Sequence, residues 1–283
     1  MITFPNAKIN IGLQVTARRP DGYHDLDTVF YPIPLCDALE VVEKDAADGS
    51  DCTLHLTGTP LEGCPDDNLV VKAVRLLRSE GYVFPSVEVW LTKRIPSGAG
   101  LGGGSADAAF MLTTLNTMFA LGIGDDRLEQ LAARLGADCA VFIRNRPAYA
   151  TGIGDRLTPL PLSLDGMTLV VVKPDLFIST REAFQGVVPC PPTETLQQKV
   201  LRPVSEWNGL ISNDFEATTV PLHPELPMLK QTLYDRGALY ASMSGSGSAL
   251  YALFAPSDSS TIPVCADDFP GCFFYATVLP YDR

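Results

Sequence analysis

The glycine-rich segment at residues 96–105, which reads PSGAGLGGGS, is the strongest candidate for chemistry in this sequence. Glycines have no Cβ, so backbone N–H groups can close around a phosphate, and a helix that begins at Ser105 would add the partial positive charge of its N-terminus. So many glycines also cost more ordering entropy than a plain connector requires. The segment therefore predicts a phosphate-binding loop, and a flexible structural turn is the less favoured interpretation.

Two other phosphate-binding motifs can be compared with this loop. Gly98, Gly100 and Gly103 satisfy the G-x-G-x-x-G pattern of dinucleotide-binding folds, but that pattern alone is weak. The strand expected just before the loop, at residues 86–93, alternates as an antiparallel strand would, and it follows hairpin-like strands instead of opening a β-α-β unit. A Walker A loop would require a lysine where Gly104 stands. Both motifs are disfavoured.

Several residues outside the loop could support chemistry on a phosphate. Lys8 lies on the polar side of an otherwise apolar strand and could supply the cation that the loop lacks, although a solvated lysine is the usual case. Asp138 precedes an apolar stretch, where the local pattern favours a helix cap. His24 is expected to be a surface residue of a loop. The segment at residues 244–248, which reads SGSGS, is either a second place where amides approach a ligand or a plain hairpin turn.

Periodicity predicts the elements that must position these residues. Apolar and polar residues alternate over residues 7–15, which indicates a half-buried strand, and a turn at residues 19–22 leads into extended chain. Helices are expected at residues 69–77, 105–119, 125–135 and 225–236. Further strands are expected at residues 86–93, 168–172, 239–242, 249–254 and 273–278.

Composition limits the class of protein. A chain of 283 residues that is 46% hydrophobic can bury a sizeable core and suggests two domains. The net charge of −12 disfavours nucleic acid and anionic membrane surfaces as partners, which leaves small molecules. The seven cysteines show no disulfide or zinc spacing, and neither a signal peptide nor a membrane span is apparent, so we expect a cytoplasmic protein.

Six short segments together resemble the GHMP kinase superfamily, and the resemblance covers nearly the whole chain. They are residues 5–10 (PNAKIN), 19–24 (RPDGYH), 67–69 (DNL), 93–96 (KRIP) with the glycine loop, 135–138 (LGAD) and 244–248 (SGSGS). The DGYH sequence at residues 21–24 is the most discriminating of these segments, because the glycine loop is shared across the superfamily.

The resemblance implies an α+β fold of two domains with the active site between them. Residues 1–155 would form a ribosomal-S5-domain-2-like domain, and residues 156–283 would form a ferredoxin-like domain. The implied activity is ATP- and Mg²⁺-dependent phosphorylation of the 2-hydroxyl of a cytidine diphosphate ester of methylerythritol, in non-mevalonate isoprenoid precursor biosynthesis. The expected assembly is a monomer or a weak homodimer, and the metal ligands are left unassigned.

The resemblance also assigns residues to roles. Lys8 and Asp138 correspond to the catalytic pair. The ATP-binding residues would be Asn68, Lys93, Pro96, Ser97, Gly98, Ala99, Gly100, Leu101, Gly102, Gly103, Gly104, Ser105 and Ala106. The substrate-binding residues would be Asn10, Tyr23, His24, Thr180, Phe184, Gly245 and Ser246, with the cytosine held by the aromatic members.

Two departures from the family pattern and two alternative functions complete the sequence-based prediction. Cys139 and Ala140 follow Asp138 where the family usually has a proline, and Ala106 replaces a common second serine. One alternative is another GHMP-type kinase, of the homoserine or mevalonate kind, which would not need Tyr23. The other is a non-catalytic nucleotide sensor, which would not need both Lys8 and Asp138.

Overall fold

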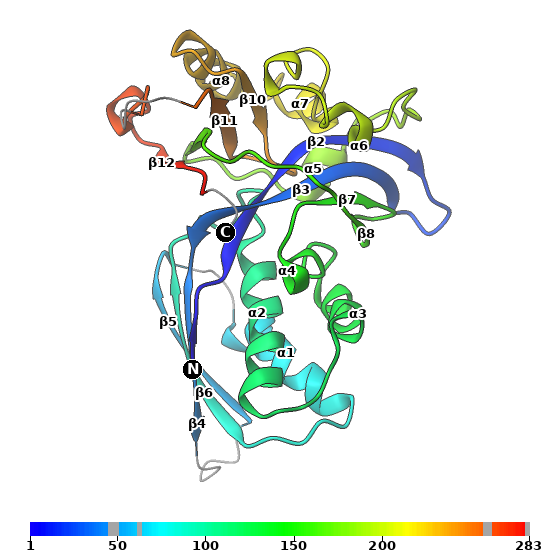
Figure 1. Cartoon of the computed structure of the whole chain (residues 1–283), viewed down its shortest axis with the longest axis vertical. Helices are drawn as coiled ribbons and strands as arrows, with labels where there is room; N and C mark the ends of the chain where they lie inside the picture. Colours follow the sequence, from blue (N-terminus) through cyan, green and yellow to red (C-terminus); the bar gives the residue numbers. More distant parts are fainter. Residues whose placement is uncertain (45–50, 61–63, 257–261, 281–283) are drawn as a thin grey trace. The chain divides into compact units, whose positions relative to one another are not determined.

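The structure is a computed structural model that describes residues 1–44, 51–60, 64–256 and 262–280 (Figure 1). Its chain forms two compact units that are interleaved along the sequence. Unit 1 comprises Met1–Ala7, Leu35–Ser97 and Gly102–Arg146, and unit 2 comprises Lys8–Pro34, Gly98–Leu101 and Pro147–Arg283. The domain boundary expected near residue 155 stays a prediction.

Unit 1 is a four-stranded sheet with helices packed on one face, as Figure 1 shows. The strand order is β1-β4-β6-β5, and the core lies between the sheet and helices α1, α2 and α3. The elements are β1 (Ile2–Thr3), β4 (Ala38–Lys44), β5 (Cys52–Gly58), η1 (Pro65–Asp67), α1 (Leu69–Ser79), β6 (Ser86–Lys93), α2 (Gly103–Met118), α3 (Asp125–Leu135) and α4 (Val141–Arg144).

Strand β6, which leads into the glycine loop, has mixed neighbours. It pairs antiparallel with β4 but parallel with β5, so β5, α1 and β6 form a β-α-β unit. The expectation of an antiparallel strand therefore holds for the pairing with β4 and was wrong for the pairing with β5, and β6 is the last strand of this β-α-β unit. Alternation along β6 arises because Val87, Val89 and Leu91 enter the core beneath the helices while the opposite face is more exposed. Alternation therefore indicates which face of a strand is buried, and it does not indicate whether a neighbouring strand is parallel or antiparallel.

The three long helices of unit 1 begin and end close to where the sequence predicts. The Asn68 side chain accepts a hydrogen bond from the Val70 N–H at 2.9 Å and caps α1. Apolar residues of α1 then enter the core at helical spacing. Helix α2 begins at Gly103, after Gly102 in the left-handed region with φ of 72°, a conformation that favours glycine. In α3, both ends are as predicted.

Unit 2 contains two four-stranded sheets. The first has the order β2-β3-β7-β8 and the second the order β10-β11-β9-β12. In the second sheet all pairs are antiparallel, and numbering its strands from β9 gives the ferredoxin-like order 4-1-3-2. The strands are β2 (Asn6–Arg18), β3 (His24–Cys36), β7 (Ala148–Thr151), β8 (Arg156–Pro159), β9 (Thr168–Lys173), β10 (Tyr240–Met243), β11 (Leu250–Phe254) and β12 (Phe273–Val278).

Short helices connect the strands of unit 2, and several of them cover the second sheet. They are α5 (Thr180–Phe184), α6 (Leu196–Lys199), η2 (Val204–Glu206), α7 (Asp214–Thr219), α8 (Glu225–Asp235) and η3 (Ala266–Asp268). The core of this unit combines residues of β2, the second sheet and helices α5, α7 and α8. Within the described ranges of the chain, no helix is long and apolar enough to span a membrane.

Strand β2 differs from its prediction in one functional respect. All residues from Asn6 to Leu13 are buried, so the strand is covered on both faces instead of being half-buried. Lys8 and Asn10 are 1% and 2% exposed, and the interpretation of Lys8 as a solvated lysine is wrong. Tertiary packing covers both polar side chains, which alternation along one strand could not show.

We expect Tyr251→Phe to destabilise the protein by about 1–3 kcal/mol, because the buried Asn10 carbonyl would lose its hydrogen-bond donor. The Tyr251 hydroxyl donates to that carbonyl at 3.0 Å. Urea unfolding measures the change. Tyr275→Phe is the control, since that hydroxyl donates to the Pro34 carbonyl at 2.9 Å in an exposed setting. Equal losses in the two variants would contradict the importance of burial at Tyr251.

Candidate functional site

Lys8 is a buried cation held beside the glycine loop within unit 2. Its Nζ donates to Asn10 Oδ1 at 2.6 Å and to the Gly100 carbonyl at 3.1 Å. The ammonium also lies 5.1 Å from the centre of the Phe30 ring. Burying a charge is costly unless it is paired or hydrogen-bonded, so these contacts offset the cost of burying the Lys8 ammonium at the loop. Asn10 is fixed in turn, since its Nδ2 donates to Thr28 Oγ1 at 2.9 Å.

The first part of the glycine loop, residues 98–101, packs directly on the segment at residues 244–248. Ser244 Oγ donates to the Gly100 carbonyl at 2.8 Å and accepts from the Asn10 N–H at 3.2 Å. A Cβ added at Gly100 would lie 1.9 Å from the Ser244 carbonyl oxygen, and the φ of Gly100 is 73°. Gly245 also approaches the loop, though less closely, since its added Cβ would lie 3.2 Å from the Gly100 oxygen. Two segments far apart in sequence therefore form one compact structure.

The predicted base-binding residues partly come together in unit 2. His24 stacks on Phe184 with ring centres 4.8 Å apart, and Phe184 also packs edge-on against Phe215. Tyr23 is 62% exposed, so its ring is available to a ligand. Thr180 is the first residue of α5, the helix that carries Phe184. His24 is partly buried and is the first residue of β3, so the expectation that it lies in a loop was wrong.

The second part of the loop, residues 102–106, belongs to unit 1 and forms the N-terminus of α2. Glycines at the start of this long helix leave its first N–H groups accessible to an anion, which the helix dipole also favours. A Cβ at Gly103 would lie 2.9 Å from Ile95 Cγ2, whereas one at Gly104 would meet only Leu69 Cδ1 at 4.0 Å. The two glycines therefore differ in their steric requirements.

Lys93, predicted to bind ATP, lies in unit 1 between two carboxylates. Its Nζ donates to Asp37 Oδ2 and to Asp107 Oδ2, the latter at 2.5 Å. All three side chains are almost fully buried, with Lys93 and Asp107 at 3% exposure and Asp37 at 0%. Neither carboxylate was expected from the sequence. A possible signal was Asp107, a single charged residue among the alanines near the start of α2.

Asp138 lies in a turn of unit 1 between α3 and α4 and is half-buried. The N-cap of α4 is Ala140, so the interpretation of Asp138 as a helix cap is wrong. The turn lies against the start of α2, because a Cβ at Gly136 would be 3.2 Å from Cys139 Sγ and 3.9 Å from Ser105 Oγ. Burial raises the pKa of the Cys139 thiol to about 12, which keeps it neutral and unreactive. Within unit 1, the structure thus brings the Asp138 turn to the second part of the loop.

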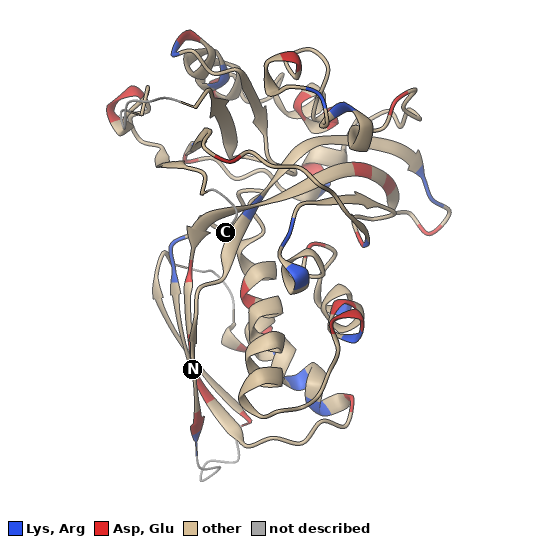
Figure 2. Cartoon of the chain, in the orientation of Figure 1, with Lys and Arg blue, Asp and Glu red and all other residues tan. Residues whose placement is uncertain are grey.

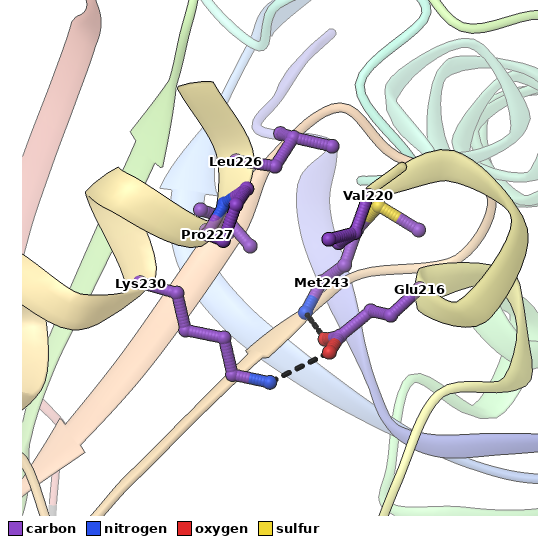
Figure 3. Close-up of a pocket in the computed structure, with 7 residues that line it drawn as sticks. Glu216, Val220, Leu226, Pro227, Lys230 and Met243 are labelled. Atoms are coloured by element: carbon purple, nitrogen blue, oxygen red, sulfur yellow. Dashed lines mark hydrogen bonds and ion pairs between the residues drawn. The ribbon is translucent and has the colours of Figure 1, made fainter. Parts of the chain in front are cut away.

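Unit 2 also has a pocket among α7, α8, β10 and β11 that contains none of the predicted site residues (Figure 3). Glu216 lies at its edge and accepts from Lys230 Nζ at 2.6 Å and from the Met243 N–H at 2.7 Å. Figure 3 shows these groups turned toward one another beside apolar side chains. The arrangement ties two helices to β10, and we assign it a structural role.

Charged residues on the surface pair with one another, and the two lysines predicted to act on ATP are buried. Figure 2 shows acidic and basic residues together on α3, where Arg127 and Arg134 pair with Glu80. Lys8 in unit 2 and Lys93 in unit 1, in contrast, are both buried.

Family models match both parts of the chain. The model for the GHMP kinases N terminal domain matches residues 68–146, which include the whole second part of the loop and Asp138. The model for the GHMP kinases C terminal matches residues 194–262, which include residues 244–248. The chain therefore belongs to the GHMP kinase family, and it is an ATP-dependent small-molecule kinase. The expected two-domain α+β fold is confirmed.

Relatives and solved structures that resemble the chain include kinases with one named substrate. A 4-diphosphocytidyl-2-C-methyl-D-erythritol kinase of Bacteroides fragilis is 52% identical over 99% of this chain and 100% of its own length. One of Porphyromonas gingivalis is 47% identical over 99% of this chain and 100% of its own. A crystal structure of 4-(cytidine 5'-diphospho)-2C-methyl-D-erythritol kinase is 35% identical, covers 89% of this chain and 90% of that one, and has a TM-score of 0.72.

We expect Gly100→Ala to destabilise the protein and weaken ATP binding, because the new Cβ would collide with backbone that cannot move without separating residues 98–101 from residues 244–248. Gly104→Ala is the matched control. It has free space in the first turn of α2, and alanine is a better helix former than glycine. Thermal melts and ATP titration decide the comparison, and equal melting temperatures for the two variants would contradict it.

Proposed function

We propose that this chain transfers the γ-phosphate of ATP to the 2-hydroxyl of 4-(cytidine 5'-diphospho)-2-C-methyl-D-erythritol, a step of non-mevalonate isoprenoid precursor biosynthesis. The proposal takes its substrate from the names of the relatives. One structural observation carries it, which is the burial of Lys8 against the Gly100 carbonyl of the glycine loop. A buried ammonium at a phosphate-binding loop is the arrangement that phosphoryl transfer requires.

Lys8 acts on the transferring phosphoryl group in this proposal. Phosphoryl transfer involves little covalent chemistry for the protein, so catalysis depends on positioning and on stabilising charge. An ammonium whose hydrogen bonds to Asn10 and Gly100 are already formed needs no reorganisation when charge develops on the phosphoryl oxygens. The loop at residues 96–106 holds the remaining phosphates through its N–H groups, and Asn68 and Lys93 complete the proposed nucleotide contacts.

Asp138 acts on the substrate hydroxyl. A tertiary hydroxyl is a poor nucleophile at neutral pH, and a carboxylate within hydrogen-bond reach can orient it and accept its proton as the new P–O bond forms. Its half-buried turn has Cys139-Ala140 after the aspartate, where the family usually has a proline. The structure shows that the turn forms without that proline, and Cys139 is buried in the core beneath it.

Substrate recognition is assigned to the remaining predicted residues. Tyr23, His24 and Phe184 offer aromatic faces to the cytosine, and Thr180 begins the helix that carries Phe184. Asn10, Gly245 and Ser246 are assigned to the rest of the substrate, next to Lys8 and Gly100. The alternative of a homoserine- or mevalonate-type kinase leaves these aromatic faces without a purpose.

Mg²⁺ is proposed to arrive with ATP. Mg²⁺ usually keeps several waters and takes only one or two carboxylates besides substrate phosphates. Among the residues that the structure describes, no group of three or more His, Cys, Asp or Glu side chains could hold a metal ion. These donors do not form a resident metal site, so we assign no ligand.

The proposal is tested by measuring ATP consumption with and without the cytidine diphosphate ester, beside homoserine and mevalonate. Turnover that depends on the cytidylyl substrate supports the assignment. Turnover with homoserine or mevalonate would return the chain to another branch of the family, and ATP binding without turnover would indicate a nucleotide sensor.

We expect Lys8→Ala and Asp138→Asn each to lower kcat by orders of magnitude, because both residues act on charge that develops during transfer. Asp138→Asn should leave the melting temperature nearly unchanged, since its side chain is only half-buried. Lys8→Ala also removes a buried hydrogen-bonding group, so its melt is recorded in parallel. Near-normal turnover in either folded variant would refute the role assigned to that residue.

We expect Tyr23→Ala to raise the KM for the cytidylyl substrate about tenfold or more, because stacking on a base is worth about 1–3 kcal/mol. The KM for ATP should barely change, and kcat should change less than the KM, because the base lies away from the reacting hydroxyl. Phe4→Ala removes an aromatic ring with the same 62% exposure and serves as the control. An unchanged substrate KM in Tyr23→Ala would refute the stacking assignment.

A further inference from the structure

The three buried charges of unit 1 hold the chain on both sides of the second part of the loop. Asp37 Oδ1 accepts from the backbone N–H groups of Arg94 at 2.5 Å and Ile95 at 2.9 Å, and its Oδ2 accepts from Lys93 Nζ. Asp37 therefore fixes the backbone where β6 ends and the loop approaches. Lys93 then connects this point to Asp107, near the start of α2.

The ammonium of Lys93 lies directly behind the first residue of α2. A Cβ added at Gly103 would be 3.4 Å from Lys93 Nζ. The N–H groups at this helix start are those assigned to phosphate, so the cluster of Asp37, Lys93 and Asp107 supports the phosphate site from the protein side. Any change in the charge of the cluster acts on a bound phosphate through protein of low dielectric, where screening by water is weak.

The two carboxylates of the cluster are not equivalent. Both oxygens of Asp37 have donors, three in all. Asp107 Oδ2 accepts from Lys93, but Asp107 Oδ1 is buried and has no hydrogen-bond partner among the residues that the structure describes. With both carboxylates ionised, the cluster carries one unbalanced negative charge behind an anion site. A proton on Asp107 removes that charge.

The pKa of Asp107 is raised, as the excess negative charge of the cluster predicts. Burial raises it from 3.8 to about 7, the attraction of Lys93 opposes the shift, and the repulsion of Asp37 adds to it. These two are the charged groups that face Asp107, Lys93 from β6 and Asp37 from the connection between β3 and β4. Asp107 therefore keeps its proton to a higher pH than an ordinary aspartate does.

We propose that Asp37 and Asp107 are positioning residues for the ATP loop, and that Asp107 takes up a proton when phosphate binds at the start of α2. The inference rests on the proposed function, because it places ATP phosphates at this loop. The proton passes from bulk water to a carboxylate oxygen of Asp107, and no other bond changes. A phosphate anion makes the second buried negative charge more costly, and by linkage a lower pH then strengthens ATP binding.

The proposal is tested by calorimetric titration of the full chain with ATP in buffers of different ionisation enthalpy. Such titrations count the protons taken up on binding, and comparison with Asp107→Asn cancels the proton changes of ATP itself. We expect wild type to take up more protons near pH 7.5 than Asp107→Asn. The wild-type affinity should fall by up to about tenfold between about pH 6 and about pH 8.5, since one pKa unit corresponds to a tenfold change. The affinity of Asp107→Asn should fall much less.

Asp126→Asn on α3 is the matched control, because its carboxylate is 89% exposed. It should show the proton uptake and pH dependence of wild type. Asp37→Asn should bind ATP more weakly than wild type at every pH, because two backbone N–H groups and an ammonium lose an anionic acceptor. Equal proton uptake in wild type and Asp107→Asn would overturn the proposal. Turnover of wild type is measured separately, so failure of the proposed function is recognised by lost turnover and not by this comparison.

A melting series without ATP supplies a second readout. A folded-state pKa raised from 3.8 to about 7 means that the stability associated with the proton is present at acid pH and is lost as pH rises toward neutral. Compared with Asp107→Asn, wild type should therefore lose melting temperature between about pH 4 and about pH 7. Parallel curves for the two proteins would overturn the assignment of the proton to Asp107.

Discussion

The contact between the Gly100 backbone and the Ser244 carbonyl is the constraint on which the unit 2 part of the site depends. The space there is too small for any side chain, and the φ of 73° excludes most residues with a Cβ. With the two segments in contact, the Gly100 carbonyl can accept from both Lys8 and Ser244. Lys8 is thereby held at the loop by backbone that only glycine can form. The glycine at this position serves packing as much as it serves phosphate binding.

The chain buries two lysines, Lys8 and Lys93, in the region of the glycine loop. A chain with a net charge of −12 repels anions over much of its surface, so a site for a nucleotide triphosphate must concentrate positive charge locally. Lys8 and Lys93 differ in this respect because their partners differ. Lys8 Nζ donates to oxygens of Asn10 and Gly100, whereas Lys93 Nζ lies between the carboxylates of Asp37 and Asp107. In the proposed function, Lys8 acts on the transferring phosphoryl group, and Lys93 contacts the nucleotide while its ion pairs connect the end of β6 to α2.

Much of the fold could be predicted because its elements have strong local signals. The Asn68 cap, the apolar spacing of α1 and both ends of α3 depend on residues within a few positions of each other. The parallel pairing of β6 with β5 could not be predicted, since it depends on a strand about thirty residues earlier and on the crossover helix between them. The burial of Lys8 was missed for the same reason. Its neighbours Phe30 and Gly100 come from distant segments, and strand alternation describes only one chain at a time.

The sequence by itself determined the kind of chemistry, because a glycine loop before a helix, a lysine on an apolar strand and the DGYH segment are each readable as residue types at fixed spacing. It also determined where most helices and strands lie, since capping and periodicity act over a few residues. Only the tertiary structure decided which polar groups share a buried environment. It pairs Lys93 with Asp37 and Asp107 in one buried cluster. It also stacks His24 on Phe184 and places Ser244 against Gly100. The physical reason is that desolvation and charge pairing depend on neighbours in space, and those neighbours come from parts of the chain that local patterns do not connect.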